Sequence, residues 1–270
     1  MRRQHIRITS IVVLFLLVLW GGWMYTHHKA QEYQADHTIK TGELRDTTFS
    51  LVSSAENSTT DYHKQYRYIE DIGDGRGYTA GIIGFTTGTG DLRQVVLEYQ
   101  KLRPNNRLVK YLPALKKVQG TASHAGLGKM FVQDWQAAAK DKKFVKAQNI
   151  ILDRQYMEPA LKAAKVDNLG PLGQYIYYDA LVVHGPGNDA SSFGGIRKQA
   201  RKLARSPIEG INQAAYLRTF LKVRSQVMRQ EKAHSDLSRL DVQMKLIKEQ
   251  NYVLKRPITW KMYGDKYRLK

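Results

Sequence analysis

Two acidic side chains stand in segments of contrasting character and could act together in hydrolysis. Glu56 comes at the end of a predicted helix, next to its apolar face, where a carboxyl group keeps its proton more readily than in water. Asp74 stands in an open loop beside Arg76, where a carboxylate stays ionised. One protonated and one ionised carboxyl group are what cleavage of a glycosidic bond requires.

Each of these residues also has a structural interpretation. A Glu at the end of a helix is commonly a solvated charge, and Asp-Gly in a loop commonly forms a turn. Gly73, Gly75 and Gly77 alternate through the loop, which lets the chain turn sharply and lets a ligand approach closely. A phosphate-binding loop is not indicated, because the run lacks the Lys-Ser/Thr pair and the strand–helix context of such loops.

The predicted elements around these residues are mostly helices. Apolar spacing predicts a helix over 44–57, a strand over 78–85 and a helix over 92–102. From residue 131 onward the pattern is helical, with predicted helices over 131–139, 144–157, 159–165, 171–184, 196–203, 208–227 and 237–250. We expect a mainly α fold with a small β element near residues 72–86, arranged as two lobes flanking a cleft.

Composition excludes several classes of protein. The chain has 270 residues, 42% of them hydrophobic, which supports a sizeable core and argues against a disordered chain. It contains no cysteine, so disulfides, zinc–thiolate sites, iron–sulfur clusters and cysteine nucleophiles are excluded. No metal or cofactor motif is visible, and we expect none to be needed.

Charge is strongly positive but unevenly distributed. The chain carries 43 Lys and Arg against 24 Asp and Glu, a formal net charge of +19, which by itself suggests a polyanion as partner. Residues 51–100 run against this trend with 4 basic and 7 acidic side chains, whereas residues 101–270 have 33 basic and 13 acidic ones. We therefore expect a negative cleft on a positive body, with the basic surface able to associate with a cell wall or membrane.

The N-terminus has the features of a targeting segment. Arg2, Arg3 and Arg7 precede an apolar run, and the uncharged stretch over 8–26 is 19 residues long. This fits either a cleaved secretory signal or an uncleaved membrane anchor, and no clear cleavage site decides between them. We expect residues 1–26 to form the signal or anchor, 27–42 a linker and 43–270 a catalytic domain outside the cell, secreted or tethered.

Seven motifs carry a specific resemblance, which covers about residues 43–268. They are LVSSAENS at 51–58, YIEDIGDGRGYTAGIIGF at 68–85, KYLPAL at 110–115, ASH at 122–124, HGPGND at 184–189, FGGIR at 193–197 and WKMYGD at 260–265. In these motifs the chain resembles the chitosanases of glycoside hydrolase family 46. It departs from the family pattern at Thr86, where Cys is common, and at Tyr62, where Trp is common.

The resemblance implies a fold and an activity. The fold is lysozyme-like, with two mostly helical lobes around a cleft, and the activity is endo-hydrolysis of β-1,4 linkages in chitosan with inversion at the anomeric carbon. Glu56 matches the general acid, Asp74 the general base, and Thr79 the residue that helps hold the attacking water. Inversion needs room for that water, so the two carboxyl groups should lie about 6.5–9.5 Å apart.

Further residues take roles from the same resemblance. Asp91 matches a residue that binds a substrate amine, although it also suits a helix N-cap. Asp179 matches the centre of an Arg–Asp–Arg network with Arg224 and Arg239, or else forms a purely structural ion pair. Substrate-contacting positions are matched by Arg76, Glu70, His184 and Glu231, with a structural role for His184 as the alternative.

Two other functions remain as alternatives at this stage. A lysozyme-like hydrolase could attack peptidoglycan or chitin, but N-acetyl groups call for apolar pockets, whereas the acidic block favours free amines. A basic, membrane-tethered protein that binds polyanions would explain the charge of residues 101–270. It would not explain the matched motifs. We expect chitosan as the partner, no nucleic acid, and a monomer.

Overall fold

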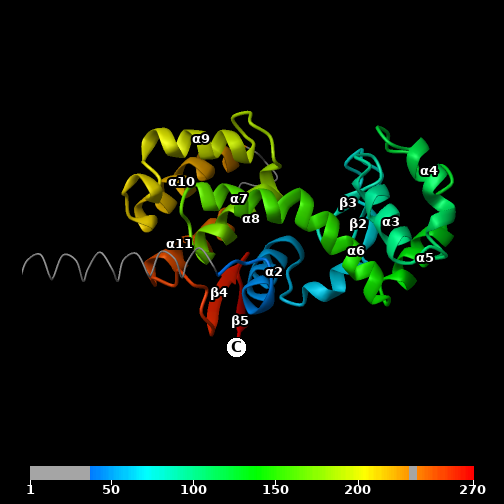
Figure 1. The fold of residues 1–270 in the computed structure, drawn as a ribbon, viewed down its shortest axis with the longest axis horizontal. Coiled ribbons are helices and arrows are strands. Elements are labelled where there is room, and N and C mark those ends of the chain that lie inside the picture. The colour runs from blue at the N-terminus through cyan, green and yellow to red at the C-terminus, as the bar shows by residue number, and fades with distance from the viewer. Residues whose placement is uncertain (1–36, 231–235) are drawn as a thin grey trace, which may run out of the picture.

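Two helix-rich lobes are joined by one long helical segment in the computed structural model, which describes residues 37–230 and 236–270 (Figure 1). The segment consists of α6 (Lys142–Leu152), a π-helical turn η3 (Asp153–Met157) and α7 (Glu158–Val166). The mainly helical, two-lobed fold expected from the sequence is confirmed.

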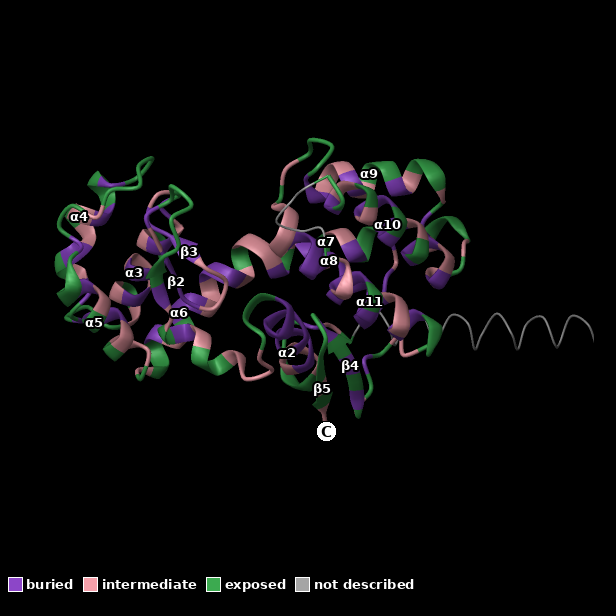
Figure 2. Ribbon diagram, turned by 180° about the vertical axis from the view of Figure 1, so that it is seen from behind, coloured by how far each residue is buried: buried purple, intermediate pink, exposed green. Residues whose placement is uncertain are grey.

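The larger lobe is built around two helices that are buried on nearly every side. In α2 (Gly42–Asn57) the run from Thr47 to Ala55 is buried, and in α8 (Pro171–His184) the run from Pro171 to Leu181 is buried (Figure 2). A helix that is buried all round belongs at the centre of a lobe. The helices α9 (Phe193–Leu203), α10 (Gln213–Met228) and α11 (Ser238–Lys248) complete this lobe, with a short 3-10 turn η4 (Pro207–Glu209).

The smaller lobe carries an antiparallel sheet in the order β1 (Ile69–Asp71), β2 (Tyr78–Ala80) and β3 (Phe85–Thr86). The remaining elements of this lobe are η1 (Tyr62–Arg67), α3 (Asp91–Leu102), η2 (Val109–Tyr111), α4 (Leu112–Lys117) and α5 (Lys129–Ala138). The register pairs Asp71 with Tyr78, so the loop that contains Asp74 connects β1 to β2.

Two predictions about strands were wrong. The predicted strand over 78–85 is two strands, because Gly81 and Gly84 adopt φ of +76° and +73° and turn the chain between β2 and β3. The sequence prediction also missed a C-terminal hairpin of β4 (Ile258–Met262) and β5 (Asp265–Leu269). Burial alternates along β4, which is the pattern of a strand with one covered face.

The predicted targeting segment over 1–26 lies outside the described residues. Within the part of the chain that the structure describes, no helix combines the length and apolarity needed to span a membrane. The last residues of the predicted linker are packed onto the domain, since Ile39 is fully buried and its N–H donates to Gln174 Oε1 at 3.0 Å. The folded body therefore includes residues from Ile39 onward.

Candidate active site

A cavity of about 650 Å³ lies where α2 and α8 of the larger lobe face the sheet and α3 of the smaller lobe. Of the residues expected to act in catalysis or substrate binding, Glu56, Arg76, Thr79 and Asp91 line it. They come from one helix, one loop, one strand and the start of another helix. The cleft that the sequence suggested is therefore present, and it brings these four residues to one space.

Glu56 lies in the last turn of α2, with 43% of its side chain exposed. Its Oε1 accepts a hydrogen bond from Nη2 of Arg239, a residue of α11 that lies 183 positions further along the chain. The sequence interpretation placed this carboxyl group against apolar surface. The structure instead gives it a guanidinium as its immediate partner.

Behind this pair lies a buried network of charges. Asp179 of α8 is fully buried between Arg239, whose Nε is 3.2 Å from its Oδ1, and Arg224, whose Nη1 donates to its Oδ2 at 2.7 Å. Gln243 Nε2 donates to the same Oδ2 at 2.7 Å. Burial raises the pKa of Asp179, but the positive charges of Arg239 and Arg224 outweigh that effect and hold it below its usual value.

Asp74 lies in the exposed loop between β1 and β2 and is held by a single neighbour. Arg76 Nε donates to its Oδ2 at 2.8 Å, and the backbone N–H of Arg76 donates to its Oδ1 at 3.0 Å. The Arg76 side chain lowers the pKa of Asp74, so its charged form is favoured. Asp74 itself is not among the residues that line the cavity, but its partner Arg76 is.

Thr79 lies in the middle of β2 with 8% of its surface exposed. Its Oγ1 is buried and has no hydrogen-bond partner among the described residues, although the side chain lines the cavity. A buried hydroxyl without a hydrogen-bond partner is costly, so this one calls for a partner that the described side chains around it do not supply.

Asp91 is the first residue of α3, with Gly90 as the N-cap. Its Oδ1 accepts hydrogen bonds from the backbone N–H of Thr86 at 2.7 Å, from Thr89 Oγ1 at 2.7 Å and from the N–H of Leu92 at 2.8 Å. Burial raises the pKa of Asp91. Thr86, one of the two departures from the family pattern, lines the cavity, and its backbone N–H binds this carboxylate.

Comparison with known families places the chain in one of them. The profile of Glycosyl hydrolase family 46 matches residues 50–258. This chain belongs to glycosyl hydrolase family 46. The resemblance inferred from its motifs is confirmed.

Family 46 relatives are similar over most of their length. A Streptomyces sp. protein named chitosanase is 53% identical over 241 residues, which are 87% of each chain. A Bacillus subtilis chitosanase is 40% identical over 220 residues, 77% of this chain and 78% of the other. Chitosanase OU01, solved with substrate, has 50% identity and a TM-score of 0.79 over 84% of this chain and 96% of that chain.

A family 46 chitosanase of Gynuella sunshinyii, solved with chitotetraose, has 34% identity and a TM-score of 0.76. That match covers 85% of this chain and 98% of the other. The two-lobed fold is thus shared with structures that contain sugar ligands.

Two other predicted contact residues, Glu70 and His184, are not among the residues that line the cavity. Glu70 is on β1, exposed, and accepts a hydrogen bond from Tyr68 Oη at 3.3 Å. His184 ends α8, where its Nε2 accepts a hydrogen bond from Arg224 Nε at 3.1 Å. Glu231 lies outside the described residues.

The cavity of this family 46 chain also contains residues that the sequence interpretation missed. Gln155 and Tyr156 lie in the π-helical turn that joins α6 to α7, and both line it. Burial is the main cause that raises the pKa of Tyr156, and the negative charge of Asp91 adds to it. The sequence does not identify Gln155 and Tyr156 as site residues, because a Gln and a Tyr within a predicted helix are typical of its surface.

Proposed function

We propose that this chain is an endo-acting chitosanase, which hydrolyses the β-1,4 linkages between glucosamine units of chitosan. The observation that carries this function is the 53% identity, over 87% of both chains, with a protein named chitosanase. Solved relatives with substrate or chitotetraose bound support the same class of substrate.

The charge of the cavity supports a substrate that bears free amines. The charged residues that line it are Glu56 and Asp91 against Arg76. Asp91 uses Oδ1 for its three intramolecular hydrogen bonds, which leaves Oδ2 without one among the described residues. In our proposal Oδ2 accepts a hydrogen bond from a substrate ammonium group.

The proposed mechanism is a single displacement with inversion. Glu56 donates its proton to the glycosidic oxygen while Asp74 takes a proton from a water molecule that attacks the opposite face of the sugar. Thr79 holds that water through its free hydroxyl. Asp74 suits the role of base because its partner Arg76 keeps it ionised.

The network behind Glu56 has a positioning role in this proposal. Arg239 binds Glu56 and Asp179 at the same time, so Asp179 compensates part of the charge that Arg239 presents to Glu56. Arg224 in turn compensates Asp179. In this way Arg239 orients Glu56, while Asp179 compensates part of the positive charge of Arg239.

The proposal also covers the domain boundaries, the location of the protein and its contacts outside the catalytic centre. The catalytic domain, expected over 43–270 and extended to Ile39 by the packing of that residue, acts as a monomer. Residues 1–26 direct it out of the cell, either secreted or tethered. Arg76 contacts the sugar chain within the cavity. The other substrate-binding residues of the proposal are Glu70, His184 and Glu231, and Glu70 and His184 would meet the sugar chain beyond the cavity lining. The basic exterior associates with an anionic cell surface.

Reducing-sugar release from chitosan, chitin and peptidoglycan, measured side by side, tests the function. We expect the fastest release from chitosan and none from the Glu56→Gln variant. Faster release from peptidoglycan or chitin would overturn the chitosanase function. Proton NMR of the first products should show the inverted anomer, and a retained anomer would overturn only the single-displacement mechanism.

A further inference from the structure

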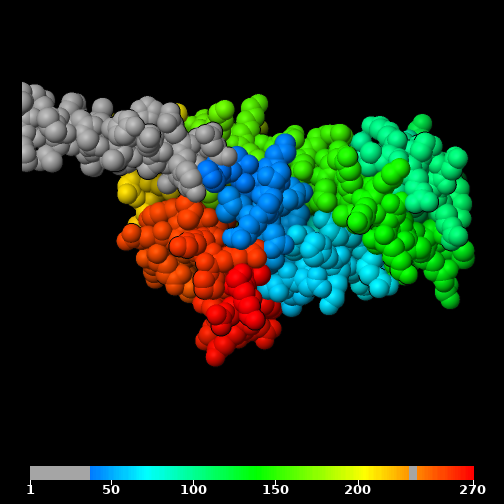
Figure 3. Space-filling view, turned by 60° about the horizontal axis from the view of Figure 1, so that its bottom comes forward, coloured from blue at the N-terminus to red at the C-terminus, as the bar shows by residue number. Residues whose placement is uncertain are grey.

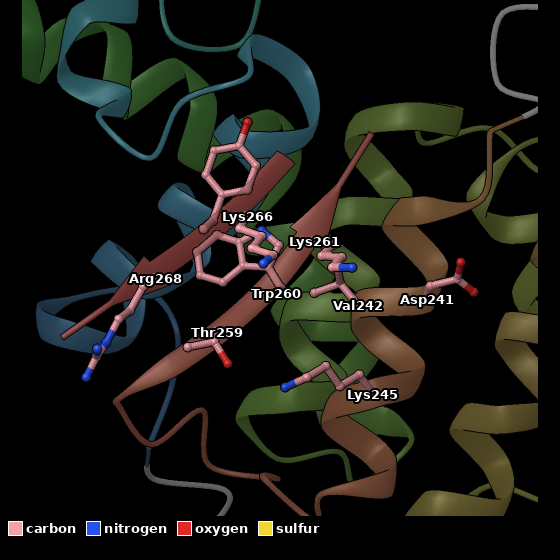
Figure 4. Close-up of a pocket in the computed structure, with 9 residues that line it drawn as sticks. Asp241, Val242, Lys245, Thr259, Trp260, Lys261, Lys266 and Arg268 are labelled. Atoms are coloured by element: carbon pink, nitrogen blue, oxygen red, sulfur yellow. The ribbon is translucent and has the colours of Figure 1, made fainter. Parts of the chain in front are cut away.

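A second groove, of about 600 Å³, lies between α11 and the C-terminal hairpin and shares no lining residue with the catalytic cavity. The hairpin projects from the body beside α11 (Figure 3). Asp241, Val242 and Lys245 of α11 line one side of the groove (Figure 4). Nothing in the proposed hydrolysis uses this groove.

Three cations gather on the exposed face of the hairpin. The register sets Lys261 directly opposite Lys266, and Arg268 lies opposite Thr259 on the same face. Like charges directly opposite each other destabilise a pair of strands. None of the three cations has an ion pair or a side-chain hydrogen bond within the described part of the chain, so this repulsion has no internal compensation.

A fourth cation comes from the helix. Lys245 forms an ion pair with Glu249 at 2.7 Å and extends from α11 toward the hairpin (Figure 4). Asp241 is the one carboxylate among the residues that line the groove, and it points away from the hairpin in the same view. Since Glu249 compensates Lys245, the net positive charge of the groove comes from Lys261, Lys266 and Arg268 on its hairpin side.

We propose that this groove binds a linear polyanion with a phosphodiester backbone and no bases, such as a polyol phosphate. Lys266 and Arg268 are two residues apart on one strand, a backbone separation of about 7 Å. Side chains of Lys261 and Lys266 start about 5 Å apart. A polymer with one negative charge per short repeat can contact Lys261, Lys266 and Arg268 at the same time, whereas a single small anion can contact only one or two of them.

Two other classes of polyanion fit less well. Single-stranded nucleic acid needs exposed aromatic faces for its bases. Of the two aromatic residues that line the groove, Trp260 is 3% exposed and donates its indole N–H to Ser54 Oγ at 2.9 Å, and Tyr267 is half-buried with its ring stacked on Trp260. The exposed Tyr263 of the hairpin turn does not line the groove. An anionic lipid surface needs apolar side chains to insert, but Val242 is 3% exposed. Chitosan, a polycation, is repelled.

The test measures binding of labelled poly(glycerol phosphate) to the full chain by fluorescence anisotropy at 50 and 200 mM salt. The variant Lys261→Gln/Lys266→Gln/Arg268→Gln should bind at least about tenfold more weakly, with a salt slope reduced by about two to three, because about one counterion is released per phosphate contact. The matched control is Lys116→Gln/Lys117→Gln/Lys129→Gln, which removes the same charge from exposed positions of α4 and α5. It should change the affinity less than about twofold.

The remaining outcomes are equally decisive. An equal loss in both triple variants would mean that net charge alone binds the polymer, and would overturn the site. Tighter binding of single-stranded DNA, or of vesicles rich in phosphatidylglycerol, would overturn the class of ligand. Chitosan hydrolysis and the thermal unfolding midpoint of the hairpin variant serve as folding controls. Hydrolysis should be retained, and the midpoint should stay the same or rise, because the variant removes the repulsion between Lys261 and Lys266. If the triple variant fails to fold, Lys266→Gln alone must still weaken binding.

Discussion

The two proposed catalytic carboxyl groups are held in opposite ways. Glu56 is tied to Arg239, and through it to the buried Asp179 and Arg224, so that four helices fix its surroundings. Asp74 is held by Arg76, two residues away in the same exposed loop. The acid thus depends on contacts between distant segments, whereas the base depends on its own loop.

This contrast has a chemical reason in the proposed mechanism. A base only has to remain ionised, and one neighbouring guanidinium in an open loop is enough for that. An acid has to hold a proton and release it in the transition state, so the charges around it must be balanced. The following predictions test the contrast, from the largest expected effect to the smallest.

Replacing Glu56 with Gln removes the proposed acid and keeps the shape of the side chain. We expect kcat on chitosan to fall by about 10²–10⁴-fold, the usual contribution of general acid catalysis. Glu43→Gln, an exposed Glu in the first turn of the same helix, is the matched control and should keep full activity. Retained activity above a few per cent of the parent would exclude Glu56 as the acid.

Replacing Asp179 with Asn leaves Arg224 and Arg239 buried without their shared carboxylate. The free energy of unfolding in urea should fall by about 3–5 kcal/mol. The exposed pair of Asp61 and Lys64 provides a control, since Asp61→Asn should cost at most about 1 kcal/mol. Equal free energies of unfolding for the two variants would mean that the buried network does not stabilise the fold around Glu56.

Asp179 also predicts a pH dependence of stability. Its pKa in the folded protein lies below its ordinary value. Its contribution to stability is therefore present above the ordinary aspartate pKa and is lost as pH falls through the lowered value. Urea unfolding at a series of acidic pH values should show this loss in the parent protein, and the Asp179→Asn variant should lack that component.

Replacing Thr79 with Val removes the free hydroxyl from the side of the base while nearly preserving volume. We expect kcat to fall by about tenfold, the cost of one hydrogen bond in the transition state. Thr79→Ser keeps the hydroxyl and should restore most of the rate. Equal rates for the Val and Ser variants would mean that Thr79 does not hold the attacking water.

Replacing Arg76 with Gln tests the local control of the base. Without the guanidinium the pKa of Asp74 should rise, so the acidic limb of the pH profile of kcat/KM should move to higher pH. Activity at neutral pH should change by less than about tenfold, since Asp74 is still ionised there. Arg103→Gln, at a similarly exposed Arg paired with Asp141, is the control and should leave the profile in place. If the acidic limb of the pH profile of kcat/KM did not move in Arg76→Gln, Asp74 would not be the base that titrates there.

Local sequence features predicted much of the fold around the base. The alternating glycines placed Asp74 in a sharp loop. Apolar spacing also predicted the helix α2 that carries Glu56, but it did not predict that the Thr and Ser residues within Thr47–Ala55 are buried as well. The predicted strand over 78–85 failed because a run of apolar residues does not reveal that Gly81 and Gly84 take left-handed φ. The C-terminal hairpin, by contrast, had a readable signal in the alternation along β4.

The sequence by itself determined the family and the pairing of Asp74 with Arg76, because these depend on residue identity and on neighbours in the chain. It also suggested Glu56 and Asp74 as the pair of carboxyl groups, which stays a proposal. Only the tertiary structure decided that Glu56 faces Arg239 rather than apolar surface, and that Tyr156 joins the cavity. It also decided that Lys261 and Lys266 share one face with no acid between them. Such contacts join residues far apart in sequence or across a hairpin, and only packing brings them together.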